Sequence, residues 1–379
     1  MKRNKVVVAC DSFKGACTSF EAGNAVLRGI LKRLPDADVA VLSVGDGGEG
    51  TAFALGTALG FTKQHFCVSD THGEPVLADF YSSNDNATAI FDMASCSGIA
   101  LAKSHGLDIL HASTVGVGQM IRHLAKLGAR EVIVCLGGSG TSDGGVGALS
   151  ELGVRFFDCR GWLITERLCP KNLRLIHSTD LEPAMKLLDG IKLTLLYDSS
   201  VKLLGECGAV MMYSRQKGAR ADMLPSLEAD MAQFSQVLSS LSANYAEVYG
   251  SGAAGGLGFG LSVVGGKLIP GADFVLDRLG FSDLLPTSTL VITGEGKTDR
   301  QSSTGKLPSA VAKRAAEFGV PVICLCGMNE AGEDIYDCGI TSVIQIGDRP
   351  MSLEESMKST LPLLEKCAYD IAGLIPHLK

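Results

Sequence analysis

Short apolar runs alternate with amphipathic stretches along the chain. The runs are rich in Val, Ile and Leu and are apolar at nearly every position, a pattern typical of strands that helices cover on both faces. They lie at residues 5–10, 39–44, 131–136, 193–197, 290–293, 320–326 and 342–346. The pattern predicts an α/β protein built on parallel sheet with helices on both faces.

The clearest structural unit begins with the first apolar run. Residues 18–21 (TSFE) have the sequence of a helix capping box, and apolar residues then recur at every fourth position over 22–34. The same order of strand, glycine loop and helix is predicted over 39–59 and again over 290–318. This repetition predicts that segments from both ends of the chain build one domain together.

The longest helix is predicted over residues 224–249, where apolar residues recur at spacings of three and four. We interpret this stripe as a face directed at the core rather than as an oligomer seam. It carries no candidate chemistry.

Composition and charge exclude several classes of protein. The chain has 379 residues, enough for two domains or one elaborate domain. Its net charge of −7 is spread along the sequence without a Lys/Arg block, so we expect no nucleic-acid binding. No run approaches the roughly 18 apolar residues of a membrane span. The twelve cysteines are scattered along the chain without the paired spacing of zinc or redox motifs. We expect them to be buried thiols of a protein in a reducing compartment. We therefore expect a cytoplasmic protein that does not contact a membrane.

Glycine is unusually frequent and is concentrated in charged loops. It accounts for 46 of 379 residues, about 12%, against a usual share of about 7%. Four loops that follow predicted strands place charged residues among glycines: 11–15 (DSFKG), 45–51 (GDGGEGT), 137–145 (GGSGTSDGG) and 293–306 (TGEGKTDRQSSTGK). Loops at the carboxyl ends of parallel strands converge on one edge of a sheet, so we expect them to share a site.

The charges in these loops indicate the chemistry. Backbone N–H groups of glycine loops approach phosphate oxygens, but carboxylates beside them repel a bare phosphate unless a divalent cation mediates. Mg²⁺ is the natural cation, and basic residues then balance a transferring phosphoryl group. The acids are Asp46, Glu49, Asp143, Glu295 and Asp299; the bases are Lys14, Lys297, Arg300 and Lys306. For Asp143 a helix cap is an equally good interpretation.

A dinucleotide-binding fingerprint is the main alternative. Gly45, Gly47 and Gly50 have the spacing G-x-G-x-x-G, and Asp70 follows twenty residues later. This alternative predicts an NAD(P)-dependent oxidoreductase of a 2-hydroxy acid. Asp46 and Glu49 oppose it, because they lie where the pyrophosphate would bind.

Other motifs give little support to other enzyme classes. Residues 303–306 (STGK) lack the first glycine of a phosphate-binding P-loop, and neither HExxH nor G-x-S-x-G occurs. The uncharged segment 250–260 is consistent either with close helix packing or with a turn against a nucleotide.

Taken in order, the motifs resemble those of the bacterial-type glycerate kinases, class I. The resemblance covers essentially the whole chain and rests on DSFKG, DGGEGT, STVGVGQ, GGSGTSDGG, QKGA, GAAGGLGFG and ITGEGKTDRQSSTGK, at residues 11–15, 46–51, 113–119, 137–145, 216–219, 252–260 and 292–306. It implies transfer of the ATP γ-phosphate to D-glycerate, giving 2-phosphoglycerate, with Mg²⁺.

The resemblance also implies an architecture. It indicates two α/β domains, with the site in the cleft between them. We place the Rossmann-like domain at residues 1–68 and 285–379, and the second α/β domain, inserted within it, at 69–284. We expect a monomer or a homodimer.

The resemblance and the charged loops together give a set of site residues. We expect in-line transfer in which Asp198 or Asp299 orients or deprotonates the C2 hydroxyl, with Lys14 as the third catalytic residue. The expected Mg²⁺ ligands are Asp46, Glu49 and Glu295. The expected ATP contacts are Ser12, Gly47, Gly48, Gly137, Gly138, Ser139, Gly294, Gly296, Gln301 and Lys306.

Several positions depart from the family pattern. An Arg-Asp-Pro expected before the STVG motif begins here with Leu107, and an Asn-Pro expected after Asp198 is replaced by Val201 and Lys202. Gly140 and Ser142 stand where Ala and Asn are usual. These departures leave open a kinase of a related small hydroxy acid, or a ligand sensor without catalysis.

Overall fold

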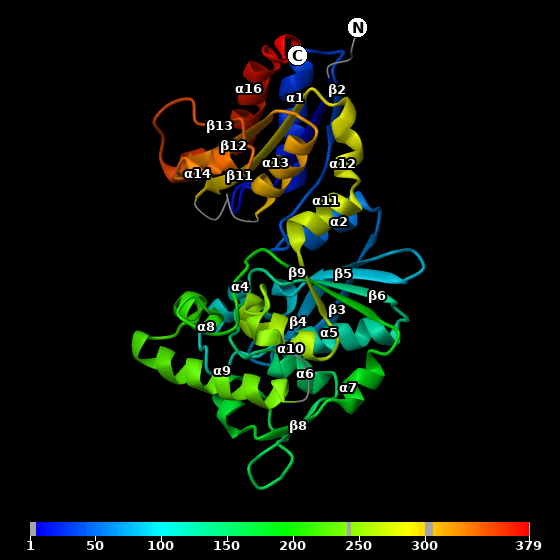
Figure 1. Cartoon of the computed structure of the whole chain (residues 1–379), viewed down its shortest axis with the longest axis vertical. Coiled ribbons are helices and arrows are strands. Elements are labelled where there is room, and N and C mark those ends of the chain that lie inside the picture. The colour runs from blue at the N-terminus through cyan, green and yellow to red at the C-terminus, as the bar shows by residue number, and fades with distance from the viewer. Residues whose placement is uncertain (1–4, 241–243, 300–305, 379) are drawn as a thin grey trace. The chain divides into compact units, whose positions relative to one another are not determined.

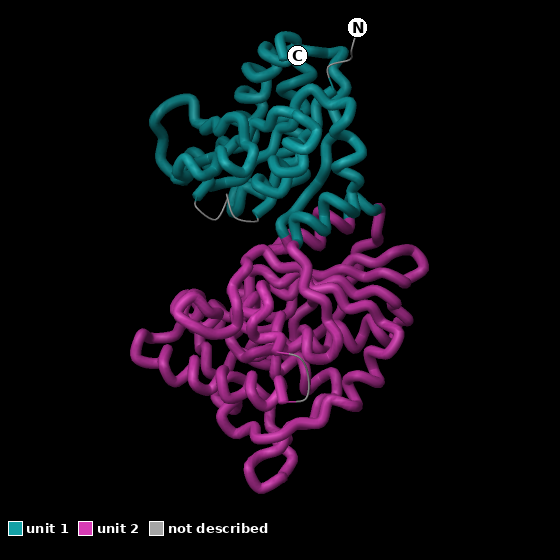
Figure 2. The backbone as a smooth tube through the Cα atoms, in the orientation of Figure 1, with its two compact units in different colours: residues 1–46, 57–59, 271–379 teal, residues 47–56, 60–270 magenta. Residues whose placement is uncertain are grey.

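The computed structural model describes residues 5–240, 244–299 and 306–378. The chain divides into two compact units, which Figure 2 shows in different colours. Unit 1 comprises residues 1–46, 57–59 and 271–379, and unit 2 comprises 47–56 and 60–270. Both contain sheets and helices, so the predicted α/β class is confirmed (Figure 1).

Unit 1 is built on a parallel sheet. Within the described residues its strand order is β13-β12-β11-β1-β2, and every pair is parallel. The strands are β1 (Lys5–Cys10), β2 (Asp38–Val41), β11 (Leu290–Thr298), β12 (Val322–Asn329) and β13 (Ser342–Gln345). Each coincides with a predicted apolar run. The interior strand β1 pairs with strands from both ends of the chain, as the repetition of the motif predicted.

Helices cover both faces of this sheet. On one face Val6 and Val8 share a core with Ile30 of α1 and Leu364 of α16. Residues of β1 alternate between faces, and α13 contacts β1, β11 and β12. The helices are α1 (Ser19–Arg33), α11 (Gly271–Arg278), α12 (Phe281–Leu284), α13 (Leu307–Glu317), α14 (Asp334–Asp337), α15 (Leu353–Lys358) and α16 (Thr360–Ala372), with 3-10 turns η6 (Leu285–Thr287) and η8 (Ile375–His377).

Helix α1 begins at the predicted capping box. The Thr18 hydroxyl accepts from the Glu21 N–H at 3.2 Å, and the Glu21 carboxylate accepts from the Thr18 N–H at 2.9 Å. Further along, α1 packs closely on α16, because a Cβ atom at Gly29 would lie 2.2 Å from the carbonyl oxygen of Glu365. Glycine is required there by the close approach of the two helices.

Unit 2 contains a mixed sheet. Its order is β10-β9-β6-β5-β4-β3, in which β3–β4 and β4–β5 are antiparallel and the other pairs are parallel. The strands are β3 (Thr62–Ser69), β4 (Pro75–Ser82), β5 (Thr88–Asp92), β6 (Glu131–Cys135), β9 (Lys192–Tyr197) and β10 (Lys267–Pro270), with a small antiparallel pair β7 (Arg155–Phe157) and β8 (Ser178–Asp180). The two apolar runs predicted in this unit form the parallel pair β6–β9, whereas the antiparallel strands β3 and β4 were not predicted. Exposed and covered residues alternate along much of β3, so it lacks a continuous apolar run.

The described helices of unit 2 range from 4 residues in α3 to 16 in α9. They are α2 (Thr51–Ala58), α3 (Ala94–Ser97), α4 (Ile99–Ser104), α5 (Val115–Lys126), α6 (Val146–Glu151), α7 (Glu182–Leu187), α8 (Ala209–Tyr213), α9 (Leu224–Ser239) and α10 (Leu257–Val263), with 3-10 turns η1 (Pro170–Leu175), η2 (Arg215–Lys217), η3 (Ala221–Met223), η4 (Tyr245–Glu247) and η5 (Ala253–Gly256). The helix predicted over 224–249 is α9, and its apolar stripe is buried as expected. It ends ten residues early, at two serines, which favour helix ends over helix interiors.

The boundaries of the two units differ from the domain boundaries predicted at residues 68/69 and 284/285. Strand β3 pairs along its whole length with β4, so it belongs to the sheet of unit 2. Helix α11 belongs to unit 1, where Arg314 of α13 pairs with Asp273 at 3.0 Å and with Asp277 at 2.5 Å. Both differences arise from pairing across long stretches of sequence.

Two other expectations concern membranes and thiols. Among the described residues, no helix is both long and apolar enough to cross a bilayer. The twelve cysteines, all of them described, form no disulfide. The expectation of buried thiols is wrong for Cys67, Cys159 and Cys207, which are exposed.

Candidate active site

In unit 1, the loops after β1 and β11 line a cavity of about 760 Å³. Cys10 pairs with Gly294, and the next N–H, that of Asp11, donates to the Gly294 carbonyl at 2.8 Å. The two loops therefore leave the sheet side by side. The cavity brings together seven predicted site residues: Ser12, Lys14, Asp46, Glu295, Gly296, Asp299 and Lys306.

Two further predicted ATP contacts, Gly294 and Gln301, do not line the cavity within the described residues. Gly294 lies within β11, where a Cβ atom would come within 2.5 Å of the Leu325 carbonyl oxygen. Close packing of the neighbouring strand therefore requires glycine at this position. Gln301 lies outside the described residues.

Buried carboxylates dominate the electrostatics of this cavity. Asp46 is 5% exposed and Glu295 7% exposed, and both line the cavity with Asp11. Burial, then Asp46 and to a smaller extent Glu295, raise the pKa of Asp11 well above its usual range, while the Ser12 N–H and Lys14 oppose the rise. Asp11 was not among the predicted site residues. Nothing in the sequence DSFKG separates it from an ordinary turn aspartate, because its burial depends on β11.

These acids fit a divalent cation. Repulsion between these carboxylates contributes to the raised pKa of Asp11. A bound Mg²⁺ would offset their negative charge, and carboxylate oxygens are among the ligands that it prefers. Among residues 5–240, 244–299 and 306–378, no three acidic, His or Cys side chains already have the arrangement of a complete metal site. Mg²⁺ typically uses only one or two protein carboxylates and takes its other ligands from phosphates and water.

In unit 2, the loop after β6 holds a second group of predicted residues. Gly137 and Gly138 approach residues 48 and 49 so closely that side chains do not fit. A Cβ atom at Gly137 would lie 2.3 Å from the Gly48 Cα, and one at Gly138, where φ is +73°, would lie 2.8 Å from Glu49 Oε2. The Glu49 carboxylate therefore lies against the Gly138 backbone.

Asp198 lies next to this loop. Strands β6 and β9 are parallel, with Cys135 opposite Leu196, so Gly137 and Asp198 leave the sheet two residues beyond that pair. Asp198 is half-buried. Unit 2 thus places Glu49, the glycines of the loop and Asp198 at the carboxyl end of its parallel strands.

Lys217 is a buried base at the same loop. It was not among the predicted site residues. It is 2% exposed, and its Nζ donates to Ser139 Oγ and to the Thr141 carbonyl, both at 2.7 Å. The motif QKGA marked its position, but nothing local in that motif distinguishes a buried lysine from an exposed one.

Asp143 has a structural role. It is fully buried and accepts hydrogen bonds from the Thr114 N–H and hydroxyl and from the N–H groups of Gly145 and Gly147. Burial raises its pKa, and these hydrogen bonds oppose the rise. Asp143 thus accepts from the Gly147 N–H in the first turn of α6, although the N-cap residue of that helix is Gly145.

The dinucleotide fingerprint does not have the geometry it requires. Pyrophosphate would bind at the N-terminus of α2, but there the Asp92 carboxylate accepts from the N–H groups of Gly50 at 2.9 Å and Ala52 at 3.0 Å. Asp70, the supposed ribose ligand, accepts from three backbone N–H groups of its own turn and contacts His105 Nε2 at 2.6 Å. Both acids are already engaged within the protein.

Asp92 gives rise to a prediction about stability. Burial raises its pKa to about 6, above the value near 3.9 expected in an unfolded chain. The native state therefore retains a proton there that the unfolded state loses, so this contribution to stability falls as pH rises from about 4 to about 6. Asp92→Asn should remove this dependence. Urea unfolding of both proteins across that range should show their difference in unfolding free energy changing by up to about 3 kcal/mol; parallel profiles would contradict it.

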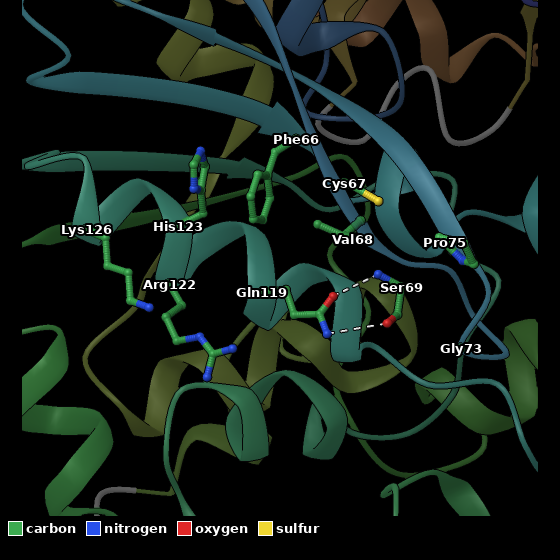
Figure 3. Close-up of a pocket in the computed structure, with 10 residues that line it drawn as sticks. All are labelled: Phe66, Cys67, Val68, Ser69, Gly73, Pro75, Gln119, Arg122, His123 and Lys126. Atoms are coloured by element: carbon green, nitrogen blue, oxygen red, sulfur yellow. Dashed lines mark hydrogen bonds between the residues drawn. The ribbon is translucent and has the colours of Figure 1, made fainter.

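A second cavity, of about 390 Å³, lies in unit 2 against β3 and α5 (Figure 3). Three of the side chains that line it contact neighbouring residues. Gln119 Oε1 accepts from the Ser69 N–H at 2.7 Å, Arg122 pairs with Glu151 at 3.0 Å, and His123 stacks on Phe66. No predicted site residue lines it, so we assign it no role in the chemistry.

Among the departures from the family pattern, Gly140 and Ser142 are buried in unit 2, and Leu107, Val201 and Lys202 are half-buried there. Lys202 is directed to Glu247 at 2.9 Å and lies 5.7 Å from the ring centroid of Tyr249. Leu107 has a left-handed φ of +57°, and its carbonyl oxygen would lie 1.8 Å from a Cβ atom at Gly218. Leu107 thus packs against the residue that follows Lys217.

The chain has two α/β units, with acids, lysines and glycine loops at the carboxyl ends of parallel strands. This arrangement is that of a phosphate-handling enzyme. Comparisons with known proteins define the class of enzyme. The model of the glycerate kinase family matches residues 6–376. The chain is 35% identical over 375 residues to a glycerate kinase of Halalkalibacterium halodurans, covering 97% of each protein.

Two more relatives agree. The chain is 31% identical over 374 residues to the glycerate 2-kinase of Escherichia coli, covering 98% of each. A crystal structure described as a glycerate kinase 2 from Salmonella typhimurium LT2 superimposes with a TM-score of 0.83 at 30% identity, covering 98% of each chain. The chain belongs to the glycerate kinase family, as the motif resemblance predicted.

Proposed function

We propose that the protein transfers the γ-phosphate of ATP to D-glycerate, in the presence of Mg²⁺, and gives 2-phosphoglycerate. The observation that carries the proposal is the cavity of unit 1, where buried acids lie with Lys14 and Lys306 at the ends of parallel strands. Family membership supports the acceptor, and the name of the E. coli relative supports transfer to the C2 oxygen.

In this proposal Asp46 and Glu295 hold the Mg²⁺, with Asp11 beside them and Glu49 as the candidate from unit 2. The bound cation neutralises charge on the phosphates. Lys14 and Lys306 balance the remaining charge of the transferring phosphoryl group. Lys306 Nζ lies 4.0 Å from Asp299, so the ammonium also restrains that carboxylate near the cavity.

The remaining residues bind and orient the substrates. Ser12 and Gly296 line the cavity of unit 1, where we place contacts with ATP. Asp198 or Asp299 orients or deprotonates the C2 hydroxyl. The contacts proposed for unit 2 are Gly47, Gly48, Gly137, Gly138 and Ser139. Catalysis then depends mainly on position and charge, as is general for phosphoryl transfer.

A phosphorus NMR spectrum of the product tests this function. Incubation with ATP, MgCl₂ and D-glycerate should give ADP and the 2-phosphate. A 3-phosphate would overturn the regiochemistry, and transfer to another small hydroxy acid but not to D-glycerate would overturn the acceptor. Loss of NADH absorbance with hydroxypyruvate, without ADP formation, would instead identify the oxidoreductase. ATP binding without any product would identify a sensor.

A further inference from the structure

Lys217 occupies an unusual position for a lysine. It ends η2 and precedes Gly218, whose φ of +103° allows the chain to reverse and the Ala219 N–H to donate to the Ser214 carbonyl. The side chain is 2% exposed. Among the described residues Lys217 has no ion pair, and Asp143 is the charged group that acts on it from the loop after β6. Burying an ammonium group without a paired carboxylate costs several kcal/mol, so packing alone would favour an apolar side chain here.

Both hydrogen bonds of the Lys217 ammonium are with the glycine loop. Its Nζ donates to Ser139 Oγ and to the Thr141 carbonyl, each at 2.7 Å. On its other side the loop is held by α3 and α4, because Gly140 N–H donates to the Ser97 carbonyl at 2.9 Å and the Gly138 carbonyl accepts from Ile99 N–H at 2.8 Å. The backbone around Ser139 is therefore fixed from two directions.

The direction of these hydrogen bonds determines what Ser139 can do. A lysine ammonium only donates, so Ser139 Oγ accepts from it and the hydroxyl hydrogen of Ser139 must be donated elsewhere. An adjacent ammonium also makes that hydroxyl a stronger donor. Ser139 follows Gly137 and Gly138 at the carboxyl end of β6, where the loop passes Asp198.

We propose that Lys217 is a positioning residue that holds the 137–141 loop and directs the Ser139 hydroxyl as a hydrogen-bond donor to an anionic oxygen of a substrate. The oxygen belongs either to a phosphate of ATP or to the carboxylate of the hydroxy acid, which share this chemistry. The identity of the two substrates rests on the proposed function. The role of Lys217 rests on the contacts of unit 2.

The charge of Lys217 sets a pH dependence on this contact. Burial lowers the pKa of Lys217 to about 7, and Asp143 opposes the decrease. A neutral amine can accept from Ser139, which withdraws the hydroxyl hydrogen from the substrate. The anion should therefore bind more tightly below pH 7 than above it, and its binding above pH 7 should take up a proton.

The test compares Lys217→Met, Lys217→Arg and Ser139→Ala with the intact protein. Lys217→Met should raise KM for one substrate about tenfold or more and remove the transition near pH 7 from the pH profile of that KM. A change in the KM of ATP identifies a phosphate, and a change in that of D-glycerate identifies a carboxylate. Lys217→Arg should restore part of the affinity without the transition. Lys186→Met, whose lysine is exposed and paired with Glu182 at 2.7 Å, is the matched control.

Two further measurements keep the proposal testable. Combining Lys217→Met with Ser139→Ala should cost no more than Lys217→Met alone, because Ser139 acts through its contact with Lys217. Calorimetry with ATP alone and with D-glycerate alone, in buffers of different ionisation enthalpy, should show proton uptake with one of them in the intact protein and none in Ser139→Ala. This readout also serves if Lys217→Met does not fold.

The outcomes separate this proposal from the proposed function. Unchanged KM values and pH profile in a folded Lys217→Met, additive effects of the two changes, or no proton uptake with either ligand would each overturn the role of Lys217. Absence of phosphoryl transfer by the intact protein, with proton-linked binding of one ligand, would overturn the kinase proposal and leave Lys217 in its role.

Discussion

Replacement of Lys14 by alanine should lower kcat/KM for phosphoryl transfer more than tenfold, a loss of at least about 1.4 kcal/mol of transition-state stabilisation. Lys14 lines the cavity of unit 1, and its charge acts on the buried Asp11. A cation beside a transferring phosphoryl group stabilises charge that is fully developed only during the reaction, so kcat should fall together with kcat/KM. ADP release, measured at saturating and limiting ATP, separates the two parameters.

Lys366→Ala provides the matched comparison. Lys366 is an exposed lysine of unit 1 that pairs with Asp348 at 2.7 Å and does not line the cavity. Its replacement should leave turnover within about twofold of the intact protein, as surface ion pairs contribute little. Normal turnover in a folded Lys14→Ala would remove Lys14 from the catalytic residues.

Replacement of Asp46 by asparagine should have opposite effects on activity and stability. Activity should fall about 100-fold or more, because a carboxylate ligand of Mg²⁺ is lost where phosphate charge must be neutralised. Without Mg²⁺ the variant should be more stable than the intact protein, because Asp46 is the neighbouring charge that most strongly raises the pKa of Asp11. Relief of about 1 kcal/mol of repulsion would raise the midpoint of thermal unfolding of a 379-residue chain by about 1–2 °C.

Thermal unfolding with and without MgCl₂ tests both parts without relying on activity. Mg²⁺ should stabilise the intact protein more than Asp46→Asn, since a ligand stabilises the state that binds it. Asp36→Asn, at an exposed aspartate of unit 1, should change neither the stability nor the response to Mg²⁺. An Asp46→Asn protein that is less stable and equally active would show that Asp46 has a structural role.

The fold was predictable where a local pattern carries the information. The apolar runs located every strand of unit 1, and residues 18–21 located the start of α1, because both signals lie within a few residues. Strand β3 was not predicted, because its alternating pattern indicates a strand only once its pairing with β4 is known. The division of the chain near residues 60 and 270 depends on the same long-range pairing.

The candidate site divides in the same way. Glycines and charges in the loops after strands could be found from spacing, and seven of the predicted residues line one cavity of unit 1. Asp11, Asp92 and Lys217 could not be selected, because what distinguishes them is burial against distant segments. The fingerprint at Gly45 shows that a matching sequence can lack the matching site. The N–H groups at the start of its helix already donate to Asp92.

The interior position of β1 in its sheet has a consequence for synthesis of the protein on the ribosome. Strand β1 is made first, yet one of its two neighbours, β11, begins at Leu290, and α16, which packs on α1, begins at Thr360. Unit 2 can complete its sheet as soon as β10 has emerged, whereas β1 must wait with one edge open until most of the chain has been translated. A nascent chain arrested before Leu290 would therefore expose the unpaired apolar edge of β1, the kind of edge that favours aggregation until its partner strand is made.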